Sequence, residues 1–88
     1  MRLTIYGKPG CHLCDEMKSL VRSVIASHPA VSLDEVDIAK DPALLERYGL
    51  EIPVLEIDGK KVAKYRIREE ELARMIASRQ STVGNDQS

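Results

Sequence analysis

The sequence predicts an α/β domain with the element order βαβαββα, folded as a four-stranded mixed sheet with helices on both faces. A short apolar strand, an apolar face with helical spacing and a second strand follow one another, which is typical of a parallel βαβ unit. An Asp-Gly pair between two later apolar stretches indicates a tight hairpin. The strands have too few alternating polar residues to leave one face in water.

In the first half of the chain, residues 3–6 form the expected first strand, and residues 7–10, rich in glycine and proline, form a loop. Apolar residues then recur at helical spacing from Leu13, and this helix must end before Pro29 because proline cannot continue it. Residues 31–38 are predicted as the second strand, which completes the βαβ unit.

In the second half, Asp41 and Pro42 are typical of a helix start, and Gly49 of a helix end, so a short helix is predicted between them. The hairpin is expected from a strand over residues 52–57 and a return strand over residues 60–65.

The last expected helix begins with three glutamates at 69–71, whose negative charge suits a helix N-terminus. The chain of 88 residues is long enough for one domain, predicted over residues 1–78. Residues 79–88 are polar and are predicted to be a disordered tail. The core must be aliphatic, because the sequence has no Trp or Phe and only three Tyr.

Composition excludes several classes of function. With 13 basic and 14 acidic residues, the formal net charge is −1, and no basic stripe suits nucleic acid. No apolar run approaches the roughly 18–20 residues that span a bilayer, and the N-terminal apolar segment is too short for a signal peptide. We therefore expect a cytoplasmic protein with neither a membrane nor a nucleic acid as partner. In that compartment a lone C-x-x-C is more typical of redox, catalytic or metal-binding chemistry than of a structural disulfide.

The only two cysteines, Cys11 and Cys14, form a C-x-x-C where the first strand gives way to the first helix. A helix start offers unpaired N–H groups and a partial positive charge, and both favour a thiolate. We expect Cys11 to be the nucleophile. Cys14 lies about one helical turn further on, beside the apolar face, and is expected to be the more buried, resolving cysteine.

Charged neighbours can modulate this pair. A cation at Lys8 or a protonated His12 favours a thiolate at Cys11, although a solvated lysine and an exposed histidine fit the sequence equally well. Asp15 and Glu16 oppose the thiolate, so moderate acidification is expected. No metal is expected, because two cysteines and two distant histidines do not form a monomeric structural zinc site.

The Cys11-His12-Leu13-Cys14 motif, the βαβ order, Ile52-Pro53-Val54 and the Asp-Gly hairpin together resemble the thioredoxin superfamily over about residues 2–78. Within it, the segments 6–15 and 49–55 are similar to a glutaredoxin-like family of small bacterial and organellar proteins. The resemblance implies a cis peptide bond before Pro53, beside the dithiol, and pairing of the Ile52 backbone with the bound substrate. It also implies that Lys8 meets a glutathione carboxylate.

The sequence departs from glutaredoxins in two places. His12 and Leu13 replace the usual Pro-Tyr between the cysteines, and residues 62–66 replace a Gly-Gly-acidic stretch that grips the γ-glutamyl end of glutathione. Side chains there hinder a close backbone approach, so the resemblance implies the fold and the dithiol chemistry more strongly than glutathione specificity.

The sequence thus predicts a small thiol-disulfide oxidoreductase that reduces protein disulfides or glutathione mixed disulfides through Cys11 and Cys14. No tightly bound cofactor is expected, and glutathione or a reductase is the expected electron donor. Two alternatives stay open: a thioredoxin-fold binding module without catalysis, and a dimer that shares a metal or iron–sulfur centre through Cys11.

Overall fold

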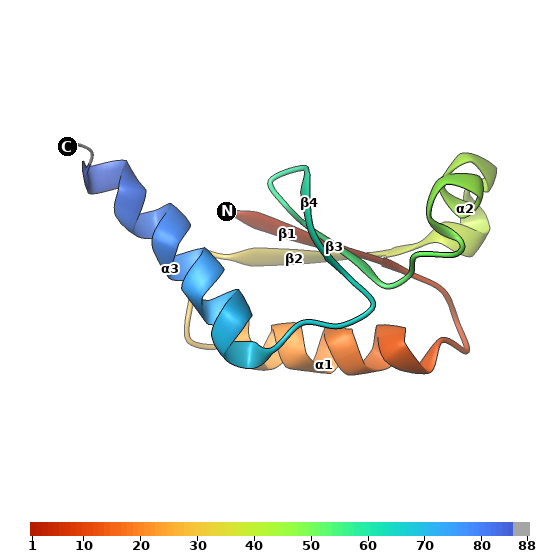
Figure 1. The fold of residues 1–88 in the computed structure, drawn as a ribbon, viewed down its shortest axis with the longest axis horizontal. Helices are drawn as coiled ribbons and strands as arrows, with labels where there is room; N and C mark the ends of the chain where they lie inside the picture. Colours follow the sequence, from red (N-terminus) through yellow and green to blue (C-terminus); the bar gives the residue numbers. More distant parts are fainter. Residues whose placement is uncertain (86–88) are drawn as a thin grey trace.

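The computed structural model describes the backbone of residues 1–85 and the side chains as far as Arg79. It has the predicted order βαβαββα, with one 3-10 turn added between the second strand and the second helix (Figure 1). In chain order the elements are β1 (Arg2–Gly7), α1 (His12–Ile25), β2 (Ser32–Asp37), the 3-10 turn (Ile38–Lys40), α2 (Pro42–Tyr48), β3 (Val54–Ile57), β4 (Lys60–Lys64) and α3 (Glu69–Asn85).

The sheet has the strand order β2-β1-β3-β4. β1 pairs with β2 in parallel and with β3 in antiparallel, and β3 pairs with β4 in antiparallel, so the predicted mixed sheet is confirmed. Asp58 and Gly59 join β3 to β4 with φ values of 49° and 86°. Two left-handed residues in succession are what this type of two-residue hairpin turn requires.

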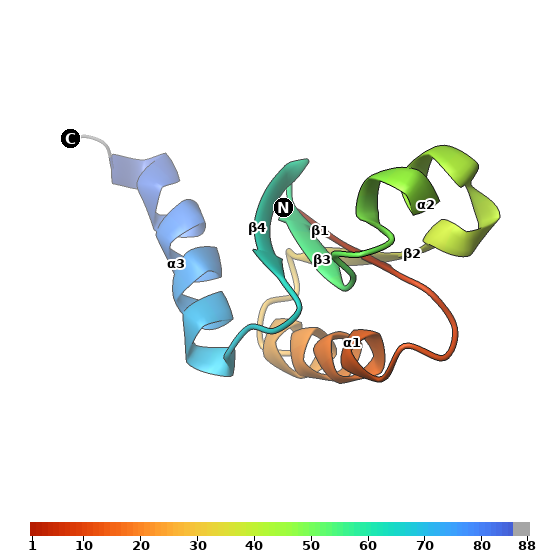
Figure 2. The same ribbon diagram turned by 45° about the vertical axis from the view of Figure 1, so that its right-hand side comes forward.

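Helices cover both faces of the sheet, as predicted. α1 and α3 lie on one face and α2 on the other (Figure 2). On the α1 and α3 side, the buried residues form one large cluster that is wholly apolar: Leu3, Ile5, Met17, Val21, Val31, Leu55, Ile57, Ile67, Leu72 and Ile76. The cluster under α2 is smaller and consists of Ile38, Tyr48 and Val54. The absence of Trp and Phe is therefore met by an aliphatic core, as expected.

The start of α2 follows the sequence prediction closely. The Asp41 carboxylate accepts hydrogen bonds from the backbone N–H groups of Ala43 and Leu44 at 3.0 and 3.3 Å, and Pro42 is the first helical residue. An Asp cap and a proline without an N–H together satisfy the helix start.

Several boundaries differ from prediction, and among them β3 begins at Val54 instead of at residue 52 and β4 ends at Lys64 instead of at residue 65. Gly7 belongs to β1, where it pairs with Asp37 of β2, instead of to the loop. The second strand ends at Asp37, because its carboxylate accepts the Ala39 N–H at 2.9 Å and starts the 3-10 turn. The disordered tail predicted for residues 79–88 is wrong for 79–85, where α3 continues without an interrupting proline, and residues 86–88 lie outside the described residues.

No helix within residues 1–85 is long and apolar enough to cross a membrane.

Candidate functional site

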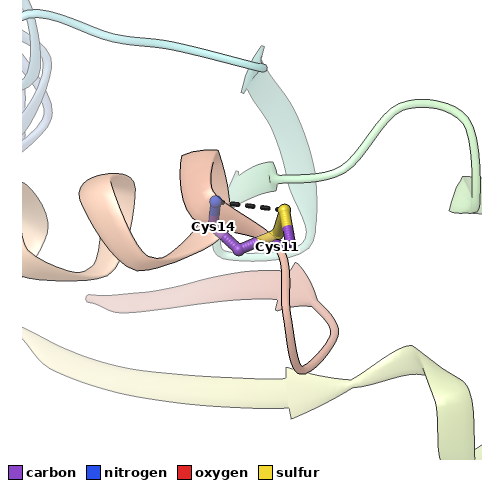
Figure 3. The surroundings of a disulfide bond; sticks show 2 residues. All are labelled: Cys11 and Cys14. Atoms are coloured by element: carbon purple, nitrogen blue, oxygen red, sulfur yellow. Dashed lines mark hydrogen bonds between the residues drawn. A yellow bond between two sulfur atoms is a disulfide. The ribbon is translucent and has the colours of Figure 1, made fainter.

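Cys11 and Cys14 are joined by a disulfide at the N-terminus of α1 (Figure 3). Cys11 immediately precedes the helix and has the extended backbone of an N-cap residue, with φ −92° and ψ 107°. Its Sγ accepts a hydrogen bond from the backbone N–H of Cys14 at 3.2 Å, where a Ser or Asp oxygen sits in most caps. The Cys11 sulfur therefore lies at the positive end of the α1 dipole, as the sequence indicated.

The two cysteines differ in exposure. Cys14 is fully buried, whereas Cys11 is partly exposed. Behind Cys14 the backbone of β1 comes so close that a Cβ on Gly7 would lie 2.9 Å from the Cys14 Sγ. Glycine at this position therefore allows Cys14 to pack under the end of β1. Sequence reasoning assigned Gly7 to the loop, although the alternation of inward residues Leu3, Ile5 and Gly7 was a signal for this role.

The structure does not bring the side chains of Lys8 and His12 into a contact with the cysteine sulfurs. The Lys8 carbonyl accepts the Cys11 N–H at 3.3 Å, which closes the loop before α1, while its ammonium is exposed. The His12 imidazole is 85% exposed and its Nε2 lies 2.8 Å from a Glu16 carboxylate oxygen, one turn further along α1. A modulating role of these two residues stays a prediction.

The peptide bond between Ile52 and Pro53 is cis, as the resemblance implied. Pro53 is buried and comes directly before Val54, which pairs with Tyr6 in the β1–β3 ladder. This register brings Pro53 to the end of β1 that Gly7 forms and that the buried Cys14 touches. The cis proline and the dithiol are therefore neighbours across the end of one strand.

Tyr65 lies in the 62–66 stretch that departs from glutaredoxins, and its contacts are what the sequence did not reveal. It follows β4 with a left-handed backbone, φ 70°, although it is not a glycine. Its N–H donates to the Pro53 carbonyl at 2.8 Å, and its hydroxyl donates to the Leu50 carbonyl at 2.9 Å. Tyr65 thus holds the segment before β3 at two points. No local pattern marks the position, because both partners are distant in sequence.

A groove of about 350 Å³ opens between α1 and the segment that joins β4 to α3. We call it the α1 groove. Its apolar lining consists of Leu13, Met17, Leu20 and Ile67, and Tyr65 is at its margin. Leu13 lies in the first turn of α1, which Cys11 caps, so one end of the groove lies at the same helix turn as the dithiol.

Charged residues at the rim of the α1 groove include Glu16 and Arg66, whose carboxylate and guanidinium are 3.7 Å apart. No group of three or more His, Cys, Asp or Glu side chains among the described residues is placed to hold a metal ion. The chemistry that the site itself offers is that of the Cys11–Cys14 pair, which can be a disulfide or a dithiol.

A four-stranded mixed sheet with a disulfide at the first helix N-terminus and a cis proline beside it defines a thioredoxin-superfamily protein of the glutaredoxin-like type. A family model of the glutaredoxin-like domain (DUF836) matches residues 2–77. The chain belongs to this family.

Solved structures agree with this assignment. The X-ray structure of protein XcR50 from X. campestris is 29% identical, with a TM-score of 0.65 over 86% of this chain and 96% of that one. Protein Ne2328 from Nitrosomonas europaea is 26% identical, with a TM-score of 0.68 over 84% of this chain and 88% of that one. Thioredoxin 1 from Thermosipho africanus has a TM-score of 0.73 over 97% of this chain and all (100%) of that one. At 11% identity this last likeness shows the fold alone.

Proposed function

We propose that this protein is a thiol-disulfide oxidoreductase that reduces protein disulfides or glutathione mixed disulfides through Cys11 and Cys14. The observation that carries the proposal is the asymmetry of the pair at the start of α1. Cys11 is partly exposed and its sulfur accepts a backbone hydrogen bond at the helix N-terminus, whereas Cys14 is buried behind it. A helix N-terminus stabilises a thiolate, and only the exposed cysteine can meet a substrate.

The reduced protein reacts in two exchanges. The Cys11 thiolate attacks one sulfur of a substrate R–S–S–R′, which forms a bond between Cys11 and R–S and releases R′–S⁻. The Cys14 thiolate then attacks the Cys11 sulfur and releases R–S⁻, and both released thiolates take protons from water. Two electrons pass to the substrate, and the product is the Cys11–Cys14 disulfide of the structure.

The dithiol is restored by two electrons from two glutathione molecules or from the dithiol of a reductase. The exposed Lys8 is available to an anionic donor or substrate, and the Ile52 backbone, at the cis peptide, is available to pair with the substrate backbone. The reaction needs no tightly bound cofactor and no metal. It suits a reducing compartment such as the cytoplasm, where a pair of this kind is regenerated.

The proposal is tested by equilibrating the protein in a series of glutathione redox buffers. Thiol exchange is then quenched, and the mass of the intact protein is measured by mass spectrometry. A clean switch between dithiol and intramolecular disulfide supports turnover and gives the reduction potential. Cys14→Ser is expected to accumulate a mixed disulfide on Cys11, and Cys11→Ser to lose the reduction of a model disulfide. A protein that stays reduced throughout, or that gathers only unresolved glutathione adducts, contradicts the proposal and favours the binding-module alternative.

A further inference from the structure

Tyr65 has an unfavourable backbone beside the dithiol. A residue with a Cβ rarely adopts φ near 70°, because the Cβ crowds the following carbonyl. The conformation is held by the two hydrogen bonds from Tyr65 to the Pro53 and Leu50 carbonyls. A glycine would accept the same backbone without strain, so what the tyrosine adds is its ring.

The Tyr65 side chain lies between the Leu50 segment and the α1 groove. Through its hydroxyl it binds the backbone carbonyl of Leu50, a residue that is 93% exposed. On the other side it is at the margin of the α1 groove, which Leu13 lines at the first turn of α1. Tyr65 as a whole is 43% exposed. The exposed Leu50 and the apolar lining of the α1 groove therefore lie on two sides of Tyr65, and exposed apolar surface of this kind marks interaction sites.

The charges at the rim of the α1 groove balance. Two glutamates, Glu16 and Glu71, and two arginines, Arg66 and Arg68, line the groove, and Glu16 is already paired with His12 and Arg66. A ligand with two carboxylates and no large apolar group, such as glutathione, finds no net positive charge in the groove. The volume of about 350 Å³ and the apolar lining suit one or two apolar side chains instead.

Building on the proposed function, we infer that Tyr65 sets the substrate class of the dithiol. The substrate is a disulfide of an extended polypeptide, and an apolar side chain next to its reactive cysteine enters the α1 groove. The Tyr65 ring contacts that side chain. The same ring keeps the backbone of a small peptide thiol away from residue 65, as a glycine would not. The chemistry is the same two exchanges, with R–S as the cysteine of the polypeptide.

The inference is tested with three mixed disulfides that share one leaving thiol: a short peptide with Leu beside its cysteine, the same peptide with Ser there, and glutathione. The kcat/KM of the reduced protein is measured for each. We expect the Leu peptide to be preferred over the Ser peptide and over glutathione by about tenfold or more, the scale of one apolar contact in a pocket. Equal rates for the Leu and Ser peptides overturn the inference.

Variants separate the ring from the backbone. Tyr65→Gly is expected to reduce both preferences to less than threefold, and to do so partly by raising the rate with glutathione. Tyr65→Phe keeps the ring and is expected to keep most of the preference for Leu.

Leu50→Ser alters a side chain that is almost fully exposed, so it tests the surface without removing packing from the core, and it is expected to weaken the preference. Asp58→Gly is the matched control, since it relieves a positive φ in the distant β3–β4 turn and should leave both ratios unchanged. Unaltered ratios in Tyr65→Gly contradict the inference.

Hydroxyethyl disulfide, which is too small to use the groove, separates this inference from the proposed function. If the wild-type protein reduces it and yet does not discriminate between the peptides, the inference is wrong and the oxidoreductase proposal stands. If the protein reduces none of the four disulfides, the proposed function itself fails.

Discussion

The two faces of the sheet are built from different chemistry. Under α1 and α3 the buried cluster is wholly apolar. Under α2 a small apolar cluster adjoins two tyrosines that share one carboxylate. The hydroxyls of Tyr6 and Tyr48 donate to the two oxygens of Glu56 at 3.2 and 2.9 Å, and their ring centroids are 4.8 Å apart. The helix that carries the cysteines belongs to the first face, and the segment around Ile52 and Val54, which leads through the cis proline, packs on the second.

Because of this difference, the stability of the two faces should depend on pH to different extents. Burial of apolar groups does not depend on protonation, so the position of α1 and its dithiol should be insensitive to pH. Hydrogen bonds between hydroxyls and a carboxylate are directional and titratable, so the support under the cis-proline segment should respond to pH. Each of the two sides of the dithiol is thus held by a different kind of force.

The largest expected effect is on the apolar face. Ile5 and Ile38 are both fully buried, Ile5 in the large cluster and Ile38 in the small one. Truncation of a buried isoleucine to alanine costs about 2–5 kcal/mol, depending on how well the site can collapse. We expect Ile5→Ala near the upper end and Ile38→Ala near the lower end, measured as the free energy of unfolding in denaturant with the disulfide intact. A larger loss for Ile38→Ala would mean that the small face carries more of the stability than its size suggests.

The second-largest loss of stability is expected at the Glu56 carboxylate, which Tyr6 and Tyr48 share. Glu56→Gln removes the negative charge and replaces one acceptor oxygen by an N–H2 donor, so one tyrosine hydroxyl must turn from donor to acceptor and both hydrogen bonds lose their charge assistance. The expected cost is about 1–2 kcal/mol of unfolding free energy, as for a partly buried hydrogen bond to a charged group. Glu35→Gln is the matched control, because Glu35 is also a strand glutamate but pairs with Arg22 at the surface. Equal losses for the two variants would show that the shared carboxylate is no more than a surface contact.

Short-range signals predicted most of the fold. The Asp41-Pro42 helix start, the Asp58-Gly59 turn and the C-x-x-C at the start of α1 each depend on residues a few positions apart. The contacts that the sequence did not reveal are those that depend on how the strands are paired and in which register.

Glu56 meets Tyr6 because β1 and β3 pair in antiparallel, and Tyr65 meets Leu50 and Pro53 because β4 returns past the segment before β3. Gly7 is an intermediate case. Its inward position follows from alternation, but the close approach of Cys14 follows only from the packing of α1 on β1.

A third effect appears only at alkaline pH. Burial, and next the nearby Glu56 carboxylate, raises the pKa of both the Tyr6 and the Tyr48 hydroxyls above the usual value of 10.0. A group whose pKa is raised in the folded state contributes stability that is fully present below its unfolded pKa. That stability is lost as the pH rises through the folded pKa. We therefore expect the unfolding free energy to fall as the pH passes about 10, because the unfolded chain ionises its tyrosines first.

The measurement is denaturant unfolding of the oxidised protein at several pH values from about 8 to about 11. The Tyr6→Phe/Tyr48→Phe double variant should lose less stability over this range than the wild-type protein, because lysine titration is common to both. If the unfolding free energy falls equally with pH in both proteins, the groups that cause the alkaline loss of stability lie elsewhere than under α2.

The smallest effect belongs to an ion pair at the edge of the cis-proline segment. Lys61 of β4 lies 3.0 Å from Glu51, next to Ile52, and its hydrogen bond and positive charge lower the pKa of Glu51 from the usual 4.5. A lowered pKa contributes stability that is present above the unfolded pKa and lost as the pH falls through the folded one. Both side chains are solvent-accessible, so water and salt screen the pair.

We expect Lys61→Met to leave stability at neutral pH almost unchanged and to reduce the acid-induced loss below about pH 4.5 slightly. Its matched control is Lys60→Met on the neighbouring exposed lysine, which has no such pair within the described chain. If Lys61→Met instead lowers stability at neutral pH by as much as Glu56→Gln, the segment before Pro53 is held from its exposed side as firmly as from α2. The contrast between the two faces would then lie in the packing of α1 alone.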